Sequence, residues 1–235
     1  MSAFNEYITA QLQTRSQAEQ IYDALKQALM TGDLKPGEAL TVSEVAAHFS
    51  VSTMPVREAL LKLAGEGLVV NDRKKAVRVP QMSLRELREI GDTRCAVEGL
   101  AVRRAVDHIG PKDIKRITAI NNTVKKAAAD SDLREYLRTN FEFHFTIYQH
   151  CNMPVLLEII QRLLALVGPT LRRLGVEGMF DAGENWHDSV IEALRDGDGD
   201  AAAAAICKDI ESSVIYIENL ETTPSNDRAP LFEAS

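Results

Sequence analysis

The chain has 235 residues and a formal net charge of −7, from 27 Lys and Arg against 34 Asp and Glu. This length permits two modest domains, each with a core of its own. We expect no membrane span, because no run of about 18 apolar residues is evident, and no signal peptide, because the first residues lack its basic-then-apolar order. The three cysteines are odd in number and scattered, which favours free thiols in a reducing cytoplasm.

The charge is distributed unevenly along the chain. Residues 1–80 contain nine basic and nine acidic side chains, whereas residues 81–235 contain 18 basic and 25 acidic ones and so carry the whole net charge. Within residues 51–80 the count is six basic to three acidic. We therefore expect contact with phosphate groups in the first eighty residues only.

Two short helices are predicted first. The residues from Ser16 to Glu19 form a capping box that opens a helix with an apolar stripe at Ile21, Leu25, Ala28 and Leu29. A turn at residues 34–37 follows, since it contains Pro and Gly. Residues 41–44 form a second capping box, which begins a two-turn helix that reaches Phe49.

A third helix and a hairpin follow. Polar Ser52 and Thr53 precede Pro55 in the first helical turn, and Gly65 and Gly67 end the helix. Short strands are expected at residues 68–70 and 76–79, on either side of a basic turn at residues 73–75. Three short helices followed by a basic hairpin predict a winged helix-turn-helix over residues 1–80.

The same stretch resembles the GntR family of bacterial transcription regulators, on the segments TGDLKPGEAL (31–40) and VSTMPVREALLKLAGEGLV (51–69). The resemblance implies that Arg57 reads base edges and that Ser52 bonds phosphate. Thr53 and Met54 depart from the family, which usually has Arg and then a small polar residue. The implied DNA-binding residues are Ser43, Ser52, Thr53, Met54, Arg57, Arg73, Lys74 and Lys75. Alternatively, Arg57 is a neighbour of Glu58 on a solvated face, and the basic turn is a solvated charge run.

From Ser83 onward the pattern is helical. Predicted helices cover residues 83–108, 112–129, 132–151, 154–174 with a bend at Gly168-Pro169, 184–195 and 200–220. This spacing predicts an all-α antiparallel bundle over residues 81–222, followed by a frayed tail at residues 223–235. The fold class expected for the whole chain is mostly α, with a winged helix-turn-helix followed by this bundle.

Four side chains in the predicted bundle could share an ion. Asn140 and His144 lie one helical turn apart, His187 falls on the fifth helix, and Asp209 falls on the sixth. Facing helices of a bundle can bring such donors together. From spacing alone the signal is weak, because a single His on a helix is more often a satisfied core or surface residue.

Residues 83–220 are similar to the helical effector-binding domain of the FadR branch, the FCD domain. The matching motifs contain Arg94 and Glu98; Asn140, Phe143 and His144; and the stretch from His187 to Asp198. In metal-binding members the ligand set is one Asp and three His. Here Asn140 replaces the Asp and Asp209 replaces the last His, so the resemblance implies weaker zinc or nickel binding, with manganese, magnesium or no ion as the other outcomes.

The family's effector site is also implied. Arg94 is expected to clamp an effector carboxylate in bidentate fashion, with Asn140 beside it. The alternative for Arg94 is an i,i+4 salt bridge to Glu98 on an exposed face.

Two functions are compared. The first is a ligand-responsive repressor in which the bundle dimerises and binds a small organic acid, while two winged helices bind a palindromic operator. The second is a metal-dependent phosphohydrolase of the HD type, with His144, His187, Asp188 and Asp209 as its constellation. No further phosphate-binding constellation accompanies this pattern, and it leaves the DNA-binding unit unexplained. We therefore expect a regulator and not an enzyme.

Overall fold

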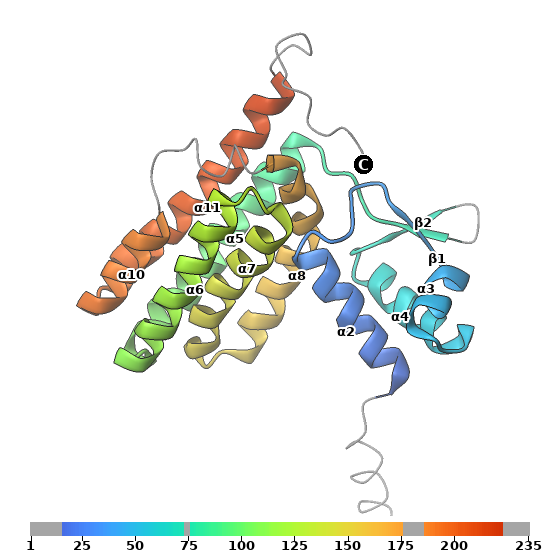
Figure 1. Cartoon of the computed structure of the whole chain (residues 1–235), viewed down its shortest axis with the longest axis horizontal. Helices are drawn as coiled ribbons and strands as arrows, with labels where there is room; N and C mark the ends of the chain where they lie inside the picture. The colour runs from blue at the N-terminus through green and yellow to red at the C-terminus, as the bar shows by residue number, and fades with distance from the viewer. Residues whose placement is uncertain (1–15, 73–75, 176–185, 223–235) are drawn as a thin grey trace, which may run out of the picture. The chain divides into compact units, whose positions relative to one another are not determined.

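The computed structural model describes residues 16–72, 76–175 and 186–222 (Figure 1). The chain divides into two compact units: Gly37–Pro80 with the residues up to Ala28, and Leu29–Pro36 with the residues from Gln81 onward. The grouping of Leu29–Pro36 with the second unit was not expected from the sequence. The division after residue 80 stays a prediction, and the expected tail at 223–235 lies outside the described residues.

Within the described residues, the first unit contains three helices and a small sheet. The helices are α2 (Gln17–Met30, whose last two residues group with the second unit), α3 (Val42–Phe49) and α4 (Thr53–Gly65). The strands β1 (Ala39–Thr41), β2 (Val70–Asp72) and β3 (Ala76–Arg78) are antiparallel in the order β1-β3-β2. Its core contains Ile21, Leu25, Val45, Val56, Leu60, Leu63, Leu68 and Val77.

Two details of this unit differ from the expectation. The strand after α4 begins at Val70 and not at Leu68, because Leu68 and Val69 are buried core residues of the turn that Gly67, at φ +73°, allows. Strand β1 was not predicted. It has three residues and no alternating pattern of its own, and it exists because Leu40 pairs with Val77 across the sheet.

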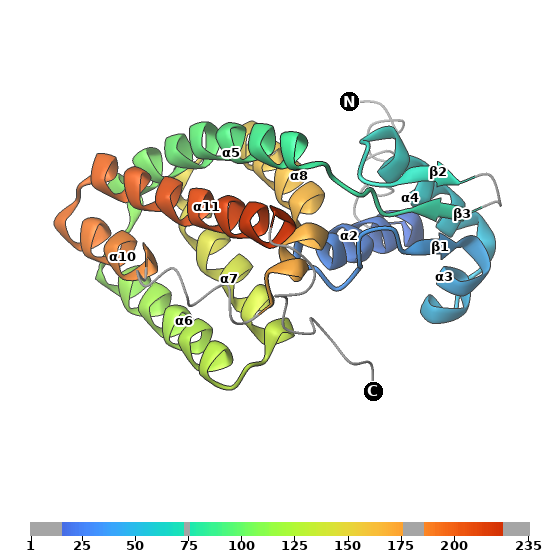
Figure 2. The ribbon, with the colours of Figure 1, turned by 90° about the horizontal axis from the view of Figure 1, so that it is seen from above.

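The second unit is a helical bundle (Figures 1 and 2). In the part of the chain that the structure describes, its helices are α5 (Leu84–Ala105), α6 (Pro111–Ala129), α7 (Leu133–Tyr148), α8 (Pro154–Leu171), α10 (Trp186–Asp196) and α11 (Gly199–Thr222). The short 3-10 turns η1 (Val106–His108), η2 (Gln149–Cys151) and η3 (Arg172–Leu174) extend α5, α7 and α8. The expected fold class, a winged helix-turn-helix followed by an α-helical bundle, is confirmed.

Local signals explain where these helices begin. The Ser83 hydroxyl and the Glu86 carboxylate form a complete capping box at the start of α5. Pro111 occupies the first turn of α6, where its missing N–H has no intrahelical role, and the Asp132 carboxylate caps α7. Each of these features was visible in the sequence.

The bundle core brings α7, α8, α10 and α11 together with α5. Its fully buried side chains include Phe143, Ile147, Tyr148, Ile160 and Ile206. Helix α11 runs alongside α5 (Figure 2), and a β-carbon at Gly99 would lie 3.6 Å from that of Ala203. Small residues therefore let these two helix backbones approach closely.

Helix α8 is apolar enough to resemble a membrane-spanning helix. Among the described helices it alone has the length and mean hydropathy of a membrane span. However, Leu156, Ile160, Leu164 and Val167 of α8 are buried in the bundle. Its composition is therefore explained by core packing.

Candidate metal centre and DNA-binding surface

Three predicted ligands meet inside the bundle. His144 on α7, His187 on α10 and Asp209 on α11 present ligand atoms that all lie within 4.8 Å of one another. The two Nε2 atoms are 3.3 Å apart, and His144 Nε2 lies 3.2 Å from Asp209 Oδ2. The His side chains are almost fully buried, whereas 23% of the Asp209 side chain is exposed. Asp209 is therefore the most exposed of the three side chains.

Asn121 fixes the orientation of His187. The Asn121 amide nitrogen donates to Asp188 Oδ1 at 2.8 Å, so the Asn121 amide oxygen faces His187 Nδ1 at 3.0 Å. Because that oxygen can only accept, Nδ1 carries the proton and Nε2 presents its lone pair to the cluster. Burial lowers the pKa of His187 to about 4, so its imidazole is neutral near pH 7.

A second buried chain of hydrogen bonds orients His144. The Tyr148 hydroxyl donates to Glu98 Oε2 at 2.6 Å and lies 3.2 Å from His144 Nδ1. Burial, followed by the charge of Glu98, raises the pKa of Tyr148 well above its usual value, so the hydroxyl keeps its proton. The hydroxyl oxygen then accepts from His144 Nδ1–H, which leaves the Nε2 lone pair facing the cluster.

The electrostatics of the cluster demand a positive charge. Burial alone would raise the pKa of Asp209, but a hydrogen bond donated by His144 and the positive charge of a protonated imidazole outweigh it and lower this pKa to about 2. With both imidazoles neutral, two Nε2 lone pairs and an ionised carboxylate would converge, which is unfavourable unless a cation lies between them. A proton on one imidazole meets this need, and so does a divalent metal ion.

The donor set fits a metal ion. Zinc–nitrogen bonds of about 2.0–2.1 Å in a tetrahedral site place two donors roughly 3.3 Å apart, and the two Nε2 atoms are 3.3 Å apart. Nickel and manganese also accept imidazole with carboxylate. Asn140 is half-buried, one turn before His144 on α7. Its expected role as a ligand stays a prediction.

Arg94 pairs with Glu98, but the pair is not on an exposed face as the alternative had it. Arg94 Nε donates to Glu98 Oε1 at 2.6 Å, and the two side chains are only 6% and 0% exposed. The prediction that this salt bridge lies on an exposed face was wrong, because other helices cover α5 on this side. The guanidinium uses Nε and one Nη for Glu98, at 2.6 and 3.4 Å. The role of Arg94 as an effector clamp stays a prediction.

The burial of this pair predicts a large loss of stability on truncation. Glu98→Ala should lower the free energy of unfolding by about 3–5 kcal/mol, since it leaves the Arg94 charge buried without its partner. Glu142→Ala is a matched control, because Arg138 and Glu142 are also an i,i+4 pair but are exposed, and it should cost less than about 1 kcal/mol. Urea unfolding followed by circular dichroism measures both. Equal losses would contradict the structural importance of the buried pair.

Asp188 does not join the cluster. Its carboxylate accepts hydrogen bonds from Asn121 and from Lys125 Nζ, the latter at 2.7 Å. The His187-Asp188 pair therefore does not present two ligands to one site, as the phosphohydrolase alternative requires. The interactions of Asn121, Tyr148 and Glu98 with the site were missed from the sequence. A polar residue at position 121 on the buried side of α6 was the available signal.

The predicted DNA-binding residues of the first unit are exposed. Thr53, Met54 and Arg57 lie on the outer face of α4, while Val56, Leu60 and Leu63 fill the core. The Ser52 backbone caps α4 without a side-chain hydrogen bond, contrary to the expected polar cap, and Ser43 is exposed on α3. The expected basic contacts Arg73, Lys74 and Lys75 lie outside the described residues. The DNA-binding roles stay predictions.

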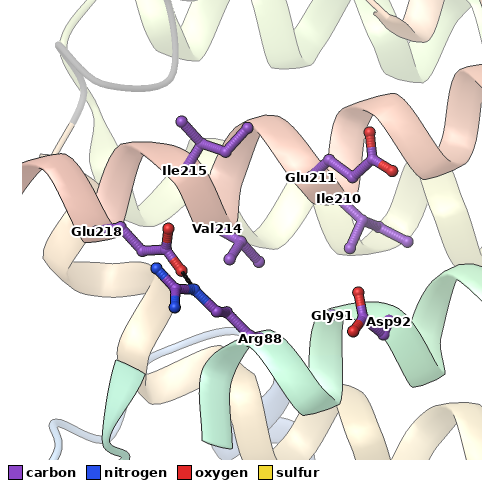
Figure 3. A pocket seen from close by; sticks show the side chains of 8 residues that line it. All are labelled: Arg88, Gly91, Asp92, Ile210, Glu211, Val214, Ile215 and Glu218. Atoms are coloured by element: carbon purple, nitrogen blue, oxygen red, sulfur yellow. Dashed lines mark hydrogen bonds and ion pairs between the residues drawn. The ribbon is translucent and has the colours of Figure 1, made fainter. Parts of the chain in front are cut away.

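A groove follows the contact between α5 and α11 (Figure 3). An ion pair between Arg88 and Glu218 closes one end of it, and Asp92 on α5 and Glu211 on α11 line it toward the other end. Gly91 keeps the groove narrow, since a β-carbon there would lie 3.0 Å from Val214. The remaining lining residues are Ile210 and Ile215.

Comparison with known proteins gives two family matches. Residues 17–79 match the model of bacterial regulatory proteins of the gntR family, and residues 89–212 match the model of the FCD domain. The cluster of His144, His187 and Asp209 falls within the second match.

Individual proteins agree with these families. The chain is 34% identical to the HTH-type transcriptional regulator McbR of Escherichia coli over 155 residues, which cover 66% of this chain and 70% of that protein. It is 27% identical to a probable D-xylose utilization operon transcriptional repressor of Paenarthrobacter nicotinovorans, over 80% of this chain and 83% of that protein. The solved structure of E. coli McbR/YncC superimposes with a TM-score of 0.83 at 28% identity, over 89% of this chain and 100% of that one.

Proposed function

We propose that this chain, which belongs to the GntR family of bacterial transcription regulators and carries an FCD domain, responds to a small carboxylate that binds beside a divalent metal ion. The transcription regulator predicted from the sequence is confirmed, as its relatives are named regulators and repressors. The metal- and carboxylate-dependent response is the proposal. One observation carries it: two oriented imidazoles and one carboxylate from three helices converge at hydrogen-bonding distance.

The ion would be held by His144, His187 and Asp209, with Asn140 as the further ligand. When bound, it supplies Lewis-acid coordination for an anionic oxygen. The protein orients the ligands. Asn121 and Tyr148 hold the imidazoles in the tautomer that carries its proton on Nδ1, so that each Nε2 offers its lone pair to the ion. Zinc, nickel and manganese are the candidate ions.

A carboxylate effector fits the charge around this site. Asp209 is the most exposed of the three ligands, and the positive charge of Arg94 contributes to the lowered pKa of Asp209. We infer that the effector carboxylate takes a position between the ion and Arg94, with Asn140 beside it. The effector must bind one arrangement of the chain better than another, because otherwise it would shift no equilibrium.

The assembly proposed for the DNA-bound state is a homodimer in the cytoplasm. Two identical winged helix-turn-helix units related by a two-fold axis fit a palindromic operator, because each unit then meets the same half-site. The role proposed is binding and regulation, without catalysis.

Calorimetric titration tests the proposal. Chelator-treated protein should bind zinc, nickel or manganese with micromolar or tighter affinity, and a carboxylate effector found by thermal-shift screening should bind more tightly to the metal-loaded form. Absence of binding by all three ions at micromolar concentration would defeat the metal proposal. The family assignment would be unaffected by that result.

Asn121 offers a sharper test of how the site is oriented. Asn121→Ala should weaken metal binding roughly 10- to 100-fold, as loss of a partner to a ligating histidine does. Asn122→Ala is the matched control, since Asn122 is the neighbouring residue on α6 and is exposed. Equal affinities of the two variants in the same titration would contradict the orienting role.

A further inference from the structure

Two of the three cysteines meet across the bundle. Cys95 on α5 and Cys207 on α11 are 112 positions apart in sequence, yet Cys95 Sγ lies 3.7 Å from the Cys207 carbonyl oxygen. The reverse contact, from Cys207 Sγ to the Cys95 carbonyl oxygen, is 3.5 Å. Each thiol therefore reaches the backbone of the other residue. Reciprocal contacts of this kind place the two cysteines directly opposite each other.

The helices that carry them approach closely. A disulfide requires β-carbons about 3.5–4.5 Å apart, which bulky neighbours would prevent. Here the adjacent turns carry Gly99 and Ala203, and a β-carbon at Gly99 would lie 3.9 Å from Cys207 Sγ. The local packing thus allows the two helix backbones to approach closely beside the cysteine pair.

Small molecules can reach this pair. Both thiols are half-buried, whereas Cys151 lies in the core at 3% exposure. The α5–α11 groove is lined by Asp92, one turn before Cys95, and by Glu211, one turn after Cys207, so its end lies about one helical turn from the pair. These carboxylates disfavour anionic oxidants and leave neutral ones unaffected. Burial, followed by the Cys207 thiol, raises the pKa of Cys95 to about 12, so the reaction is slow.

We propose that Cys95 and Cys207 form an intramolecular disulfide on exposure to a hydroperoxide, which links α5 to α11 covalently. One sulfur attacks a peroxide oxygen, breaks the O–O bond and becomes a sulfenic acid, while the other oxygen leaves as water when the oxidant is hydrogen peroxide. The second thiol then attacks the sulfenic sulfur, and the sulfenic oxygen leaves as a second water. Two thiols lose two electrons and two protons, and one S–S bond forms. This inference does not depend on the metal site.

Peptide mapping of the full chain tests it. After prolonged incubation with hydrogen peroxide, trypsin should release peptide 95–103 joined to peptide 196–208, and the intact mass should fall by two hydrogens. Cys151→Ser should give the same linked peptides, while Cys95→Ser and Cys207→Ser should not. Linkage through Cys151, or separate oxidation of Cys95 and Cys207 to sulfinic or sulfonic acids, would overturn the proposal.

The melting temperature gives a second, independent measurement. Because the link closes a loop of more than 100 residues, the disulfide form should melt higher by on the order of 5–10 °C. The reduced protein and reduced Cys95→Ser serve as references. An unchanged or lower melting temperature of the linked form would show that native packing does not accommodate the disulfide and would overturn the proposal.

Discussion

His144→Ala should abolish measurable binding of zinc, nickel and manganese by the metal-stripped protein. The substitution removes one of the three donors that converge in the bundle and leaves only His187 and Asp209 close together. The loss should exceed the roughly 10- to 100-fold decrease expected when an outer partner such as Asn121 is removed. Isothermal titration at neutral pH measures it.

Two further variants separate ligand loss from misfolding. His150→Ala removes the same side chain from the nearby turn η2, where His150 is partly exposed and lies 3.9 Å from Asp113, and it should bind metal normally. Asp209→Asn keeps the side-chain volume at a partly exposed ligand position and should also lose binding. If His144→Ala bound the same ions with unchanged affinity while remaining helical, the site would be misassigned.

Arg57→Ala should remove specific operator binding without changing helicity. Arg57 lies on the exposed face of α4, where a guanidinium can bond two acceptors of one guanine. Loss of such a contact costs about 1–3 kcal/mol at each half-site, so operator affinity should fall on the order of 10- to 100-fold or more. A gel-shift titration at physiological salt measures the change.

The control must remove the same charge elsewhere on the helix. Lys62→Ala does so, because the Lys62 ammonium lies 3.8 Å above the Tyr22 ring and not on the face that carries Arg57. It should reduce specific and non-specific DNA binding by a similar small factor. Arg57→Lys should retain non-specific binding and lose much of the specificity, since Lys lacks the planar fork. Equal operator affinity of Arg57→Ala and the unmodified chain would contradict the recognition-helix assignment.

Most helix boundaries could be predicted because their causes are local. The capping boxes at Thr41–Glu44 and Ser83–Glu86 satisfy backbone N–H groups within one turn, and both are present in the structure. The extra strand β1 could not be predicted in this way. Its three residues acquire their conformation from pairing with β3, which lies about forty residues later in the chain.

The candidate site also combines features that local sequence could predict with features that depend on residues far apart in the chain. Helical spacing suggested Asn140, His144, His187 and Asp209 as one weak candidate set, and the family resemblance strengthened it. The orienting side chains were not foreseen. Asn121 lies 66 positions from His187 and Glu98 lies 50 positions from Tyr148, so no sequence period relates them. The contact between Cys95 and Cys207 likewise joins residues that are far apart in sequence, 112 positions, and no sequence period relates them.

The sequence by itself determined most helices and the class of protein, because caps, apolar periodicity and the recognition-helix segment all act over short stretches of chain. Only the tertiary structure decided which polar side chains meet. It buried the Arg94–Glu98 pair, turned Asp188 toward Lys125 and left His144 and His187 facing each other. The physical reason is that hydrogen bonds and charges act at contact distance, and helix packing sets the contacts.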